Sequence, residues 1–375
     1  MSRVCSSCLI DESTGVSIKE NGICKYCALI DEHRDVIDAI GCKENILKQR
    51  INLFSDKGQY DCIVGLSGGK DSSYMVYRLK SNYNARVLTY TNDNGFLTPY
   101  AKENIEGIVR DFGVDHVWMR PGSDYLRAIY RSNLKKEGWP CSACVHMGES
   151  AIWTLAYEKK IPFIISGRTP EQILRRPDES CFLEDTSLVM SNLSPYDRER
   201  AVAFARRTMQ RIHAEREWLL EDRHHWENAI YLHDLKIRDD FTPEYLYFFL
   251  YEPHDDLKIM EVLEKETSWR NKAKIGILSH LDCAAHDAAG YLFSRMNGYP
   301  FVSLETNALV RHGLMEREDA SRHILKEKMD SSALPAESIR TLSQVSGIDP
   351  LILPLLPWLI KGERLLKGVL RKILK

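Results

Sequence analysis

From residue 60 onward the chain alternates short apolar runs with longer segments that carry apolar residues at helical spacing. The apolar runs are rich in β-branched and aromatic residues, which is typical of strands; they span residues 60–66, 85–93, 114–119 and 161–170. Residues 72–80 and 101–113 have helical spacing, and Gly113 marks the end of the second helix. This alternation predicts an α/β fold: a doubly wound parallel sheet with helices on both faces and ligands at the carboxyl ends of the strands.

The segments on either side of this core have other patterns. Residues 194–228 combine charges with helix formers and predict one or two long helices. The sequence therefore predicts a core with an N-terminal zinc ribbon and a helical C-terminal part. Its expected parts are a zinc ribbon at 1–30, a linker helix at 31–58, an α/β core at 59–190, a helical insertion at 191–350, and a basic amphipathic tail at 351–375.

Composition limits the classes of protein that fit. The formal charge of −2 over 375 residues argues against a globally basic nucleic-acid binder. No apolar stretch reaches the length of a spanning helix, and the first residues, MSRVCSSC, lack the apolar core of a signal peptide. Ten cysteines, several in C-x-x-C pairs, then indicate metal-binding thiolates in a cytoplasmic protein.

Two C-x-x-C pairs stand at the N-terminus: Cys5 with Cys8, and Cys24 with Cys27. Each pair can form a tight knuckle, and two knuckles supply four thiolates in a tetrahedron. The fifteen residues between the pairs match the spacing of a zinc ribbon. The sequence predicts a Zn²⁺ ion here that holds the fold together, since four protein ligands leave no open position.

The hexapeptide SGGKDS follows the first apolar run. Two adjacent glycines let successive N–H groups point at one anion, and a following helix adds the positive end of its dipole. The side chains around them offer hydroxyl donors, one ammonium group and one carboxylate that can assist a metal. The loop therefore predicts a phosphate site, whereas the alternative is a tight turn in which the glycines serve geometry alone. Its residues are Ser67, Gly68, Gly69, Lys70, Asp71, Ser72 and Ser73.

Two further predicted strands end in residues suited to the same crevice. Asp93 follows the second strand, while Gly167 and Arg168 follow the fourth. Because the carboxyl ends of parallel strands share one edge of a sheet, we expect Asp93 or Asn94 to border the bound ligand and Gly167 with Arg168 to line the far wall.

A third pair, Cys141 and Cys144, precedes the helical segment 149–160. Thiolates at a helix N-terminus are favoured electrostatically, which predicts lowered pKa values and raised reactivity. Three interpretations stay open. The pair binds a second metal with His146 or a distant cysteine, or it joins Cys181 or Cys283 in holding an iron–sulfur cluster. Otherwise the cysteines are small buried residues.

The tail at 351–375 mixes apolar residues and Trp358 with Lys and Arg. A basic amphipathic helix of this kind is typical of segments that lie on an anionic membrane surface. Docking on the domain or on another subunit is the alternative. We therefore expect a cytoplasmic protein with a possible peripheral contact at the inner face of the membrane.

SGGKDS after a buried strand resembles the signature of the N-type ATP pyrophosphatases, or PP-loop superfamily, whose core is of the adenine nucleotide alpha hydrolase type. The resemblance implies that ATP binds on this loop, that AMP is transferred to a carbonyl or carboxylate oxygen, and that pyrophosphate leaves. A nitrogen or sulfur nucleophile then displaces AMP. The resemblance also implies that the loop serines and glycines contact the phosphates, that Lys70 neutralises the charge that develops as pyrophosphate leaves, and that Asp71 is a partner of Mg²⁺.

A wider resemblance runs through the N-terminal cysteines, the loop, DNGF at 93–96 and the segment AKENIEGIVRDFGVDH. Together they resemble the N-acetyl sugar amidotransferases of surface-polysaccharide (lipopolysaccharide) biosynthesis. This similarity implies a nucleotide-sugar acceptor whose acetamido group becomes an acetamidino group, with ammonia from a separate glutaminase subunit. The C-x-x-C at Cys141 and Cys144 is instead similar to PP-loop tRNA thiolation enzymes, in which the pair and a third cysteine serve sulfur transfer. A non-catalytic nucleotide sensor is a further alternative.

Overall fold

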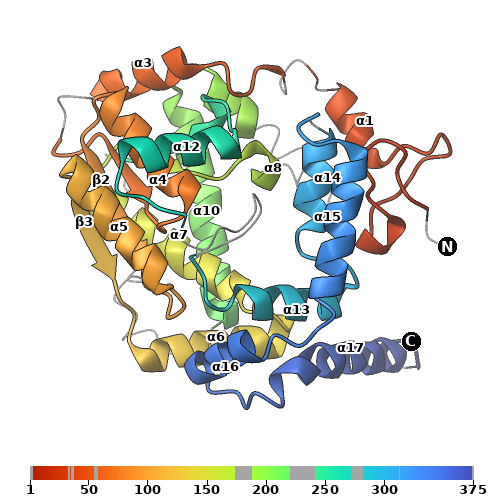
Figure 1. Cartoon of the computed structure of the whole chain (residues 1–375). Helices are drawn as coiled ribbons and strands as arrows, with labels where there is room; N and C mark the ends of the chain where they lie inside the picture. Colours follow the sequence, from red (N-terminus) through yellow and green to blue (C-terminus); the bar gives the residue numbers. More distant parts are fainter. Residues whose placement is uncertain are drawn as a thin grey trace.

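The computed structural model describes residues 3–32, 34, 38–54, 58–173, 188–219, 241–271, 282–311 and 313–373. Within these ranges five strands form one parallel sheet in the order β3-β2-β1-β4-β5 (Figure 1). The strands are β1 (Cys62–Gly65), β2 (Val87–Asn92), β3 (Asp115–Met119), β4 (Phe163–Ser166) and β5 (Glu244–Tyr247).

The order of the strands reverses next to β1. Cys62 of β1 is in register with Val87 of β2 on one side and with Phe163 of β4 on the other. The chain thus leaves β1 toward β2 and β3 and later returns across β1 to β4 and β5. In open α/β sheets such a reversal opens a crevice at the carboxyl ends of the two central strands.

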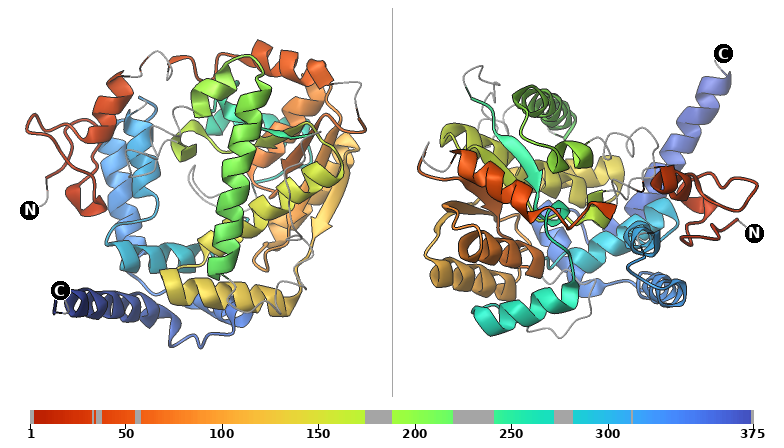
Figure 2. Two further views of the ribbon diagram at one scale, coloured as in Figure 1. Left: turned by 180° about the vertical axis from the view of Figure 1, so that it is seen from behind. Right: turned by 90° about the horizontal axis from the view of Figure 1, so that it is seen from above.

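Helices cover both faces of the sheet, as the two views of Figures 1 and 2 show. The face turned toward the viewer in Figure 1 carries α4 (Lys70–Ser81), α5 (Pro99–Phe112) and α12 (Asp256–Glu266), with α3 (Glu44–Phe54) packed against the same core. The opposite face carries α7 (Cys141–Glu158) and α10 (Arg198–Leu219).

Alternation along β1 explains the two layers. Cys62 and Val64 belong to the apolar core shared with α4, whereas Ile63, between them, packs in the core shared with α7. Successive side chains of a strand point to opposite faces, so a strand buried on both faces is apolar throughout. The continuous apolar runs of the sequence are the consequence.

Most of the remaining chain is helical. α16 and α17 pack on α6, and α13 packs on both of them, which closes the lower part of the molecule in Figure 1. Together with these four, the further helices of the described residues are α1 (Lys25–Glu32), α6 (Ser123–Glu137), α8 (Pro170–Ile173), α13 (His286–Asn297), α14 (Ser303–Arg311), α15 (Arg317–Asp330), α16 (Ala336–Ser346) and α17 (Leu356–Ile373). The 3₁₀ turns are η1 (Glu12–Thr14), η2 (Phe248–Leu250) and η3 (Leu353–Leu355).

The predicted fold class is confirmed, with all four predicted strands in one parallel sheet, a cysteine cluster at the N-terminus and a helical C-terminal part. Two details differ. The sheet extends past the boundary expected at residue 190, because the aromatic run that contains β5 joins its edge. The linker expected as one helix contains a turn at Gly41, whose φ of +76° is incompatible with a continuous helix.

The long helix expected in 194–228 is α10 as far as Leu219, and residues 220–228 lie outside the described part of the chain. Among the described helices, none is both long and apolar enough to cross a membrane.

Candidate nucleotide-binding site and metal centre

The loop between β1 and α4 is held in one shape by contacts from elsewhere in the chain. The carbonyl of Gly68 accepts hydrogen bonds from Asn104 Nδ2 (3.2 Å) and Trp269 Nε1 (3.0 Å). Gly68 has φ +81°, and a Cβ there would lie 2.3 Å from the carbonyl oxygen of Ala101. The residue must therefore be glycine, because both its conformation and the space around it exclude a side chain.

The N-terminus of α4 lies at the carboxyl end of β1, next to Gly167, which follows β4. Its N-cap residue, Gly69, provides no side-chain cap, so the first N–H groups of the helix keep their capacity to bind an anion. Ser67 and Ser72 fold the loop inward, with their Oγ atoms 3.3 Å apart. Ser73 is fully buried, and its Oγ has no hydrogen-bond partner within the described residues.

Lys70 and Asp71 lie in a charged cluster that also includes His254 and Asp256, which follow β5. Lys70 Nζ is 3.0 Å from a carboxylate oxygen of each aspartate. His254 Nε2 donates to Asp71 Oδ1 at 2.9 Å and lies 3.3 Å from Asp256 Oδ1. These contacts connect the segment after β5 to the first turn of α4, which follows β1.

Burial and charge act in opposite directions in this cluster. Burial alone would raise the pKa of Asp71, but the hydrogen bond from His254 and the charge of Lys70 outweigh it and lower that pKa. For Lys70, burial is outweighed by the two carboxylates, which raise the pKa of its ammonium group. The pKa of Asp256 is raised, chiefly by burial. Lys70 is therefore charged and Asp71 ionised at neutral pH.

Asp71, His254 and Asp256 each bring one ligand atom within 4.8 Å of the others. Carboxylates beside a phosphate loop are the ligands that Mg²⁺ prefers, and imidazole also accepts divalent metals. The donor set thus fits a divalent cation next to the predicted phosphate site.

The other predicted crevice residues lie at separate places around the loop. Gly167 packs on α4, where an added Cβ would lie 3.7 Å from Ser72 N. Arg168 pairs with Glu149 at 3.8 Å, and Asp93 lies 3.7 Å from Lys102 and 3.9 Å from Arg120. Gly167 thus borders the phosphate loop, while Arg168 and Asp93 face charged partners.

Cys144 and Cys283 come together near the carboxyl end of β2. Asn94 Nδ2 donates to Cys144 Sγ at 2.9 Å, and Tyr130 donates from its hydroxyl to the carbonyl of Asn94. Cys283 pairs with Leu97 in an isolated antiparallel bridge. Its neighbour Asp282 lies beside the phosphate loop, 3.8 Å from where a Cβ of Gly69 would be. The cysteine region therefore adjoins the phosphate loop.

The lowered pKa expected at the start of α7 is wrong for Cys144. Burial raises the pKa of its thiol above the ordinary value. Burial and the neighbouring charge of Cys144 raise the pKa of Cys283 to about 12. Desolvation thus outweighs the helix dipole here, because these thiols lie among apolar side chains.

His146 lies away from any ligand group that the described residues form. Its ring is buried, and Nδ1 lies 3.2 Å from Glu215 Oε2 of α10. Cys181 lies outside the described part of the chain. Of the two distant cysteines considered as a third partner, Cys283 interacts electrostatically with Cys144, but among the described residues the thiols of Cys141, Cys144 and Cys283 do not all lie within 4.8 Å of one another.

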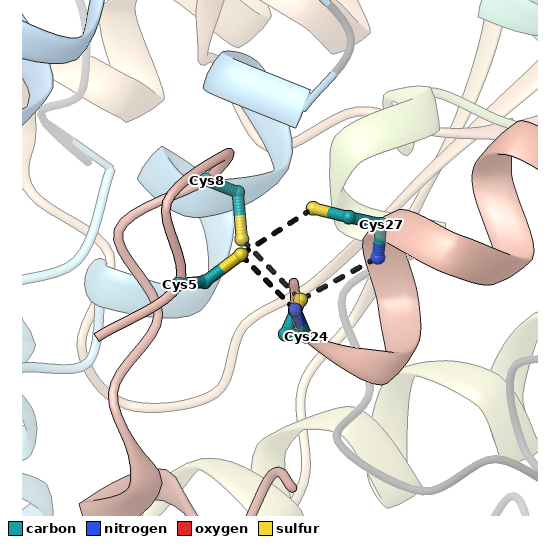
Figure 3. Close-up of side chains that lie close together, drawn as sticks. All are labelled: Cys5, Cys8, Cys24 and Cys27. Atoms are coloured by element: carbon teal, nitrogen blue, oxygen red, sulfur yellow. Dashed lines mark hydrogen bonds between the residues drawn. The ribbon is translucent and has the colours of Figure 1, made fainter. Parts of the chain in front are cut away.

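The four N-terminal cysteines converge as predicted (Figure 3). Cys5 Sγ lies 3.9 Å from Cys27 Sγ, and Cys8 Sγ lies 3.6 Å from Cys24 Sγ. A tetrahedral ion with metal–sulfur bonds of about 2.3 Å separates its sulfurs by about 3.8 Å. All four side chains are buried. The cluster therefore fits one closed, four-coordinate metal ion.

Helices from the C-terminal part enclose this cluster. The guanidinium of Arg311, at the end of α14, lies 3.8 Å from Cys8 Sγ and covers the ring of Tyr26 at 5.1 Å. Arg317, at the start of α15, donates to the carbonyl of Cys5. Four thiolates around a divalent ion leave a net negative charge, which the buried Arg311 offsets. The contacts join the N-terminal unit to α14 and α15 (Figure 1).

Sequence reasoning missed several residues of the site. His254 and Asp256 follow β5, and Asn104 with Trp269 supports Gly68. A signal existed for the first two, because an aromatic run followed by the sequence HDD at 254–256 has the form of a strand followed by polar ligands. Asn104 and Trp269 carried no local signal, since their role depends on distant contacts.

Fold and site together define an α/β protein with a glycine-containing loop and an uncapped helix N-terminus at the reversal of a parallel sheet, and with a tetracysteine unit at its N-terminus. No family model matches the chain. A segment of 165 residues is 26% identical to the uncharacterized protein MJ1599 of Methanocaldococcus jannaschii. The match covers 44% of this chain and 58% of that relative, so the chain spans little more than half of the relative's length.

Two solved structures are similar to this chain at low sequence identity and low TM-score. The U34-tRNA thiolase NcsA from Methanococcus maripaludis, with its [4Fe-4S] cluster, is 16% identical with a TM-score of 0.36, over 87% of this chain and 89% of that one. The NH3-dependent NAD synthetase from Campylobacter jejuni, in complex with the nitrate ion, is 12% identical with a TM-score of 0.29, over 55% and 99%. Neither similarity is high enough to assign a function to this chain.

Replacing Gly68 with alanine tests the loop geometry. The left-handed backbone alone costs about 1–3 kcal/mol for a residue with a side chain, and the new Cβ would collide with Ala101. We expect Gly68→Ala to lower the thermal midpoint and to abolish ATP binding in calorimetry. Gly290→Ala is the control, because Gly290 lies inside α13 with open space around it; it should leave both quantities intact. Equal ATP affinity in the two variants would contradict the geometry.

Metal analysis tests the tetracysteine unit. We expect purified protein to hold one metal ion per chain at this unit, and Cys8→Ser to lose it and melt at a lower temperature, because the ion links the N-terminal loops. The measurements are elemental analysis and thermal unfolding. Cys42→Ser is the control, since Cys42 is exposed and lies outside the cluster. Unchanged metal content in Cys8→Ser would refute a four-cysteine site.

Proposed function

We propose that the protein is a PP-loop ATP pyrophosphatase that adenylates a carbonyl oxygen of its substrate and releases pyrophosphate. The observation that carries the proposal is the Gly68-centred loop, with its uncapped helix N-terminus, at the reversal of the sheet. The resemblance of SGGKDS to that superfamily agrees with this geometry. An oxygen leaves an amide or carboxylate poorly, whereas AMP is a good leaving group, so adenylation prepares the carbon for a nucleophile.

The loop residues then have distinct roles. The N–H groups that follow Gly69 and the hydroxyls of Ser67, Ser72 and Ser73 donate to the phosphates of ATP. Lys70 offsets the charge that develops as pyrophosphate leaves. Asp71 holds Lys70 and, with His254 and Asp256, would hold a Mg²⁺ ion, which neutralises phosphate charge when bound. Asp93 borders the nucleotide, and Gly167 with Arg168 lines the opposite wall.

The tetracysteine unit has a structural role in this proposal. Four thiolates with buried side chains suit Zn²⁺, and a closed coordination sphere leaves no position for a substrate. We further propose that the enzyme works in the cytoplasm, where reduced thiolates persist.

The product pattern of ATP cleavage tests the proposal. We expect the wild type to convert ATP to AMP and pyrophosphate, not to ADP and phosphate, and Lys70→Met to lose at least about a hundredfold in rate, because the charge on the leaving group is no longer offset. Chromatography of ATP labelled at the α-phosphate measures this. Lys258→Met, which removes a lysine that is 80% exposed on α12, should keep full activity. Formation of ADP by the wild type would overturn the proposal.

The second half-reaction has two candidates. The resemblance to N-acetyl sugar amidotransferases of surface-polysaccharide biosynthesis favours nitrogen: ammonia from a glutaminase subunit converts the acetamido group of a nucleotide sugar to an acetamidino group. The gathering of Cys144 and Cys283 beside the phosphate loop favours sulfur, with Cys141 as the third cysteine and a tRNA base or a small molecule as acceptor. Three such thiols also suit an iron–sulfur cluster.

Donor dependence separates the two candidates. Under sulfur transfer, anaerobically purified protein absorbs as an iron–sulfur protein, sulfide raises AMP release, and Cys144→Ser removes both properties. Under nitrogen transfer, ammonium with a nucleotide N-acetyl sugar raises AMP release, and Cys144→Ser leaves the rate unchanged. Cys42→Ser is the matched control for both experiments. AMP release that depends on neither donor would exclude both candidates and keep only the adenylation step.

A further inference from the structure

The C-terminal helix α17 is held on the body by its first turns. Leu353, Leu356 and Ile360 are buried in the apolar cluster that includes residues of α6 and α13. Beyond them, Lys361 donates to the carbonyl of Arg295 at 3.0 Å, and Arg364 donates to the carbonyl of Lys136 at 3.1 Å. One side of the helix, with its basic residues, thus faces the protein.

The other side exposes a row of large apolar side chains, which we call the outer stripe. Their spacing of three and four residues places them on one face of the helix and of the turn before it. The exposed fractions run from 46% to 80% for Leu351, Ile352, Leu355, Trp358, Leu359, Leu365 and Leu366. Gly362 occupies the same face between the two halves of the stripe, and the sequence repeats the spacing at Val369, Leu370 and Ile373.

Besides the apolar side that packs on the body, α17 carries a second apolar side, which is unusual for a helix at the surface of a soluble protein. Such a helix turns its apolar stripe to the core and its charges to water. Here α17 turns two of its cations toward carbonyls of the body and leaves the outer stripe in water. Figure 2 shows, in its view from above, that the helix extends away from the rest of the molecule, so nothing drawn there covers its far half. A contiguous apolar surface of this kind marks an interaction site.

The net charge of residues 351–375 indicates what kind of surface the outer stripe contacts. Residues 351–375 hold six basic side chains and a single acidic one, Glu363, which already pairs with Lys367 at 2.6 Å. Two copies that met through this helix would bring like charges together. An anionic lipid surface instead offers hydrocarbon for the outer stripe and negative headgroups for the flanking lysines and arginines. We propose that α17 docks the protein on an anionic bilayer, lying in its surface and not spanning it.

Vesicle binding by the full chain tests this proposal. We expect co-sedimentation with vesicles of equal parts phosphatidylcholine and phosphatidylglycerol, weaker binding to phosphatidylcholine alone, and weaker binding at high salt. The variant with Leu365→Glu and Leu366→Glu should bind the anionic vesicles at least about tenfold more weakly, because two apolar anchors are lost. Lys361→Gln with Lys367→Gln should weaken that binding about fivefold per charge.

The matched control carries Leu53→Glu and Leu257→Glu, which change two exposed leucines on α3 and α12 at the opposite end of the molecule in Figure 1. This variant should bind vesicles like the wild type. Circular dichroism and thermal midpoints establish that every variant is folded, since all four leucines are exposed. Equal vesicle affinity for the stripe variant and the wild type would overturn the proposal. So would a wild-type dimer in light scattering that the stripe variant converts to monomer, which would assign the stripe to a second copy.

Discussion

A parallel sheet can gather several loops around one ligand only where its strand order reverses, and in this chain the reversal falls between β1 and β4. The phosphate loop lies there because β1 ends at Gly65 and the chain must turn at once into α4. Gly68 makes that turn, and its carbonyl is held by α5 through Asn104 and by Trp269 after α12. The carbonyl of Gly68 therefore links the loop after β1 to α5 and to the segment after α12.

Buried charges are balanced at two places: at the start of α4 carboxylates surround a cation, and at the tetracysteine unit a cation lies beside thiolates. At the start of α4, Lys70 lies between the carboxylates of Asp71 and Asp256, so its charge is balanced within the protein. The tetracysteine unit concentrates negative charge, and Arg311 from a distant helix offsets it. In both places a charge taken out of water is kept near a partner, because burial of an unpaired ion is costly.

The C-terminal half contributes to both ends. The segment after β5 brings His254 and Asp256 to the loop, α14 and α15 enclose the N-terminal cysteines, and Asp282 and Cys283 adjoin the crevice. Residues after position 190 thus contact both the loop after β1 and the N-terminal cysteines. α17 differs, because a row of its apolar side chains turns outward.

Sequence alone determined the first four strands, the glycine loop after β1 and the four N-terminal cysteines, because each depends on residues close together in the chain. Apolar runs, adjacent glycines and C-x-x-C spacing are local signals with local causes. It also marked Asp71 and Lys70 through the motif that contains them.

Tertiary structure decided what depends on distant segments. The partners of Lys70 and Asp71 come from residues 254–256, and the third cysteine near Cys144 is Cys283. The raised pKa of Cys144 also depends on tertiary structure. The sequence predicts the helix α7 and its dipole, but it does not predict that the thiol of Cys144 is buried. Desolvation is a property of the packed molecule, and at Cys144 it outweighs the field of the helix dipole.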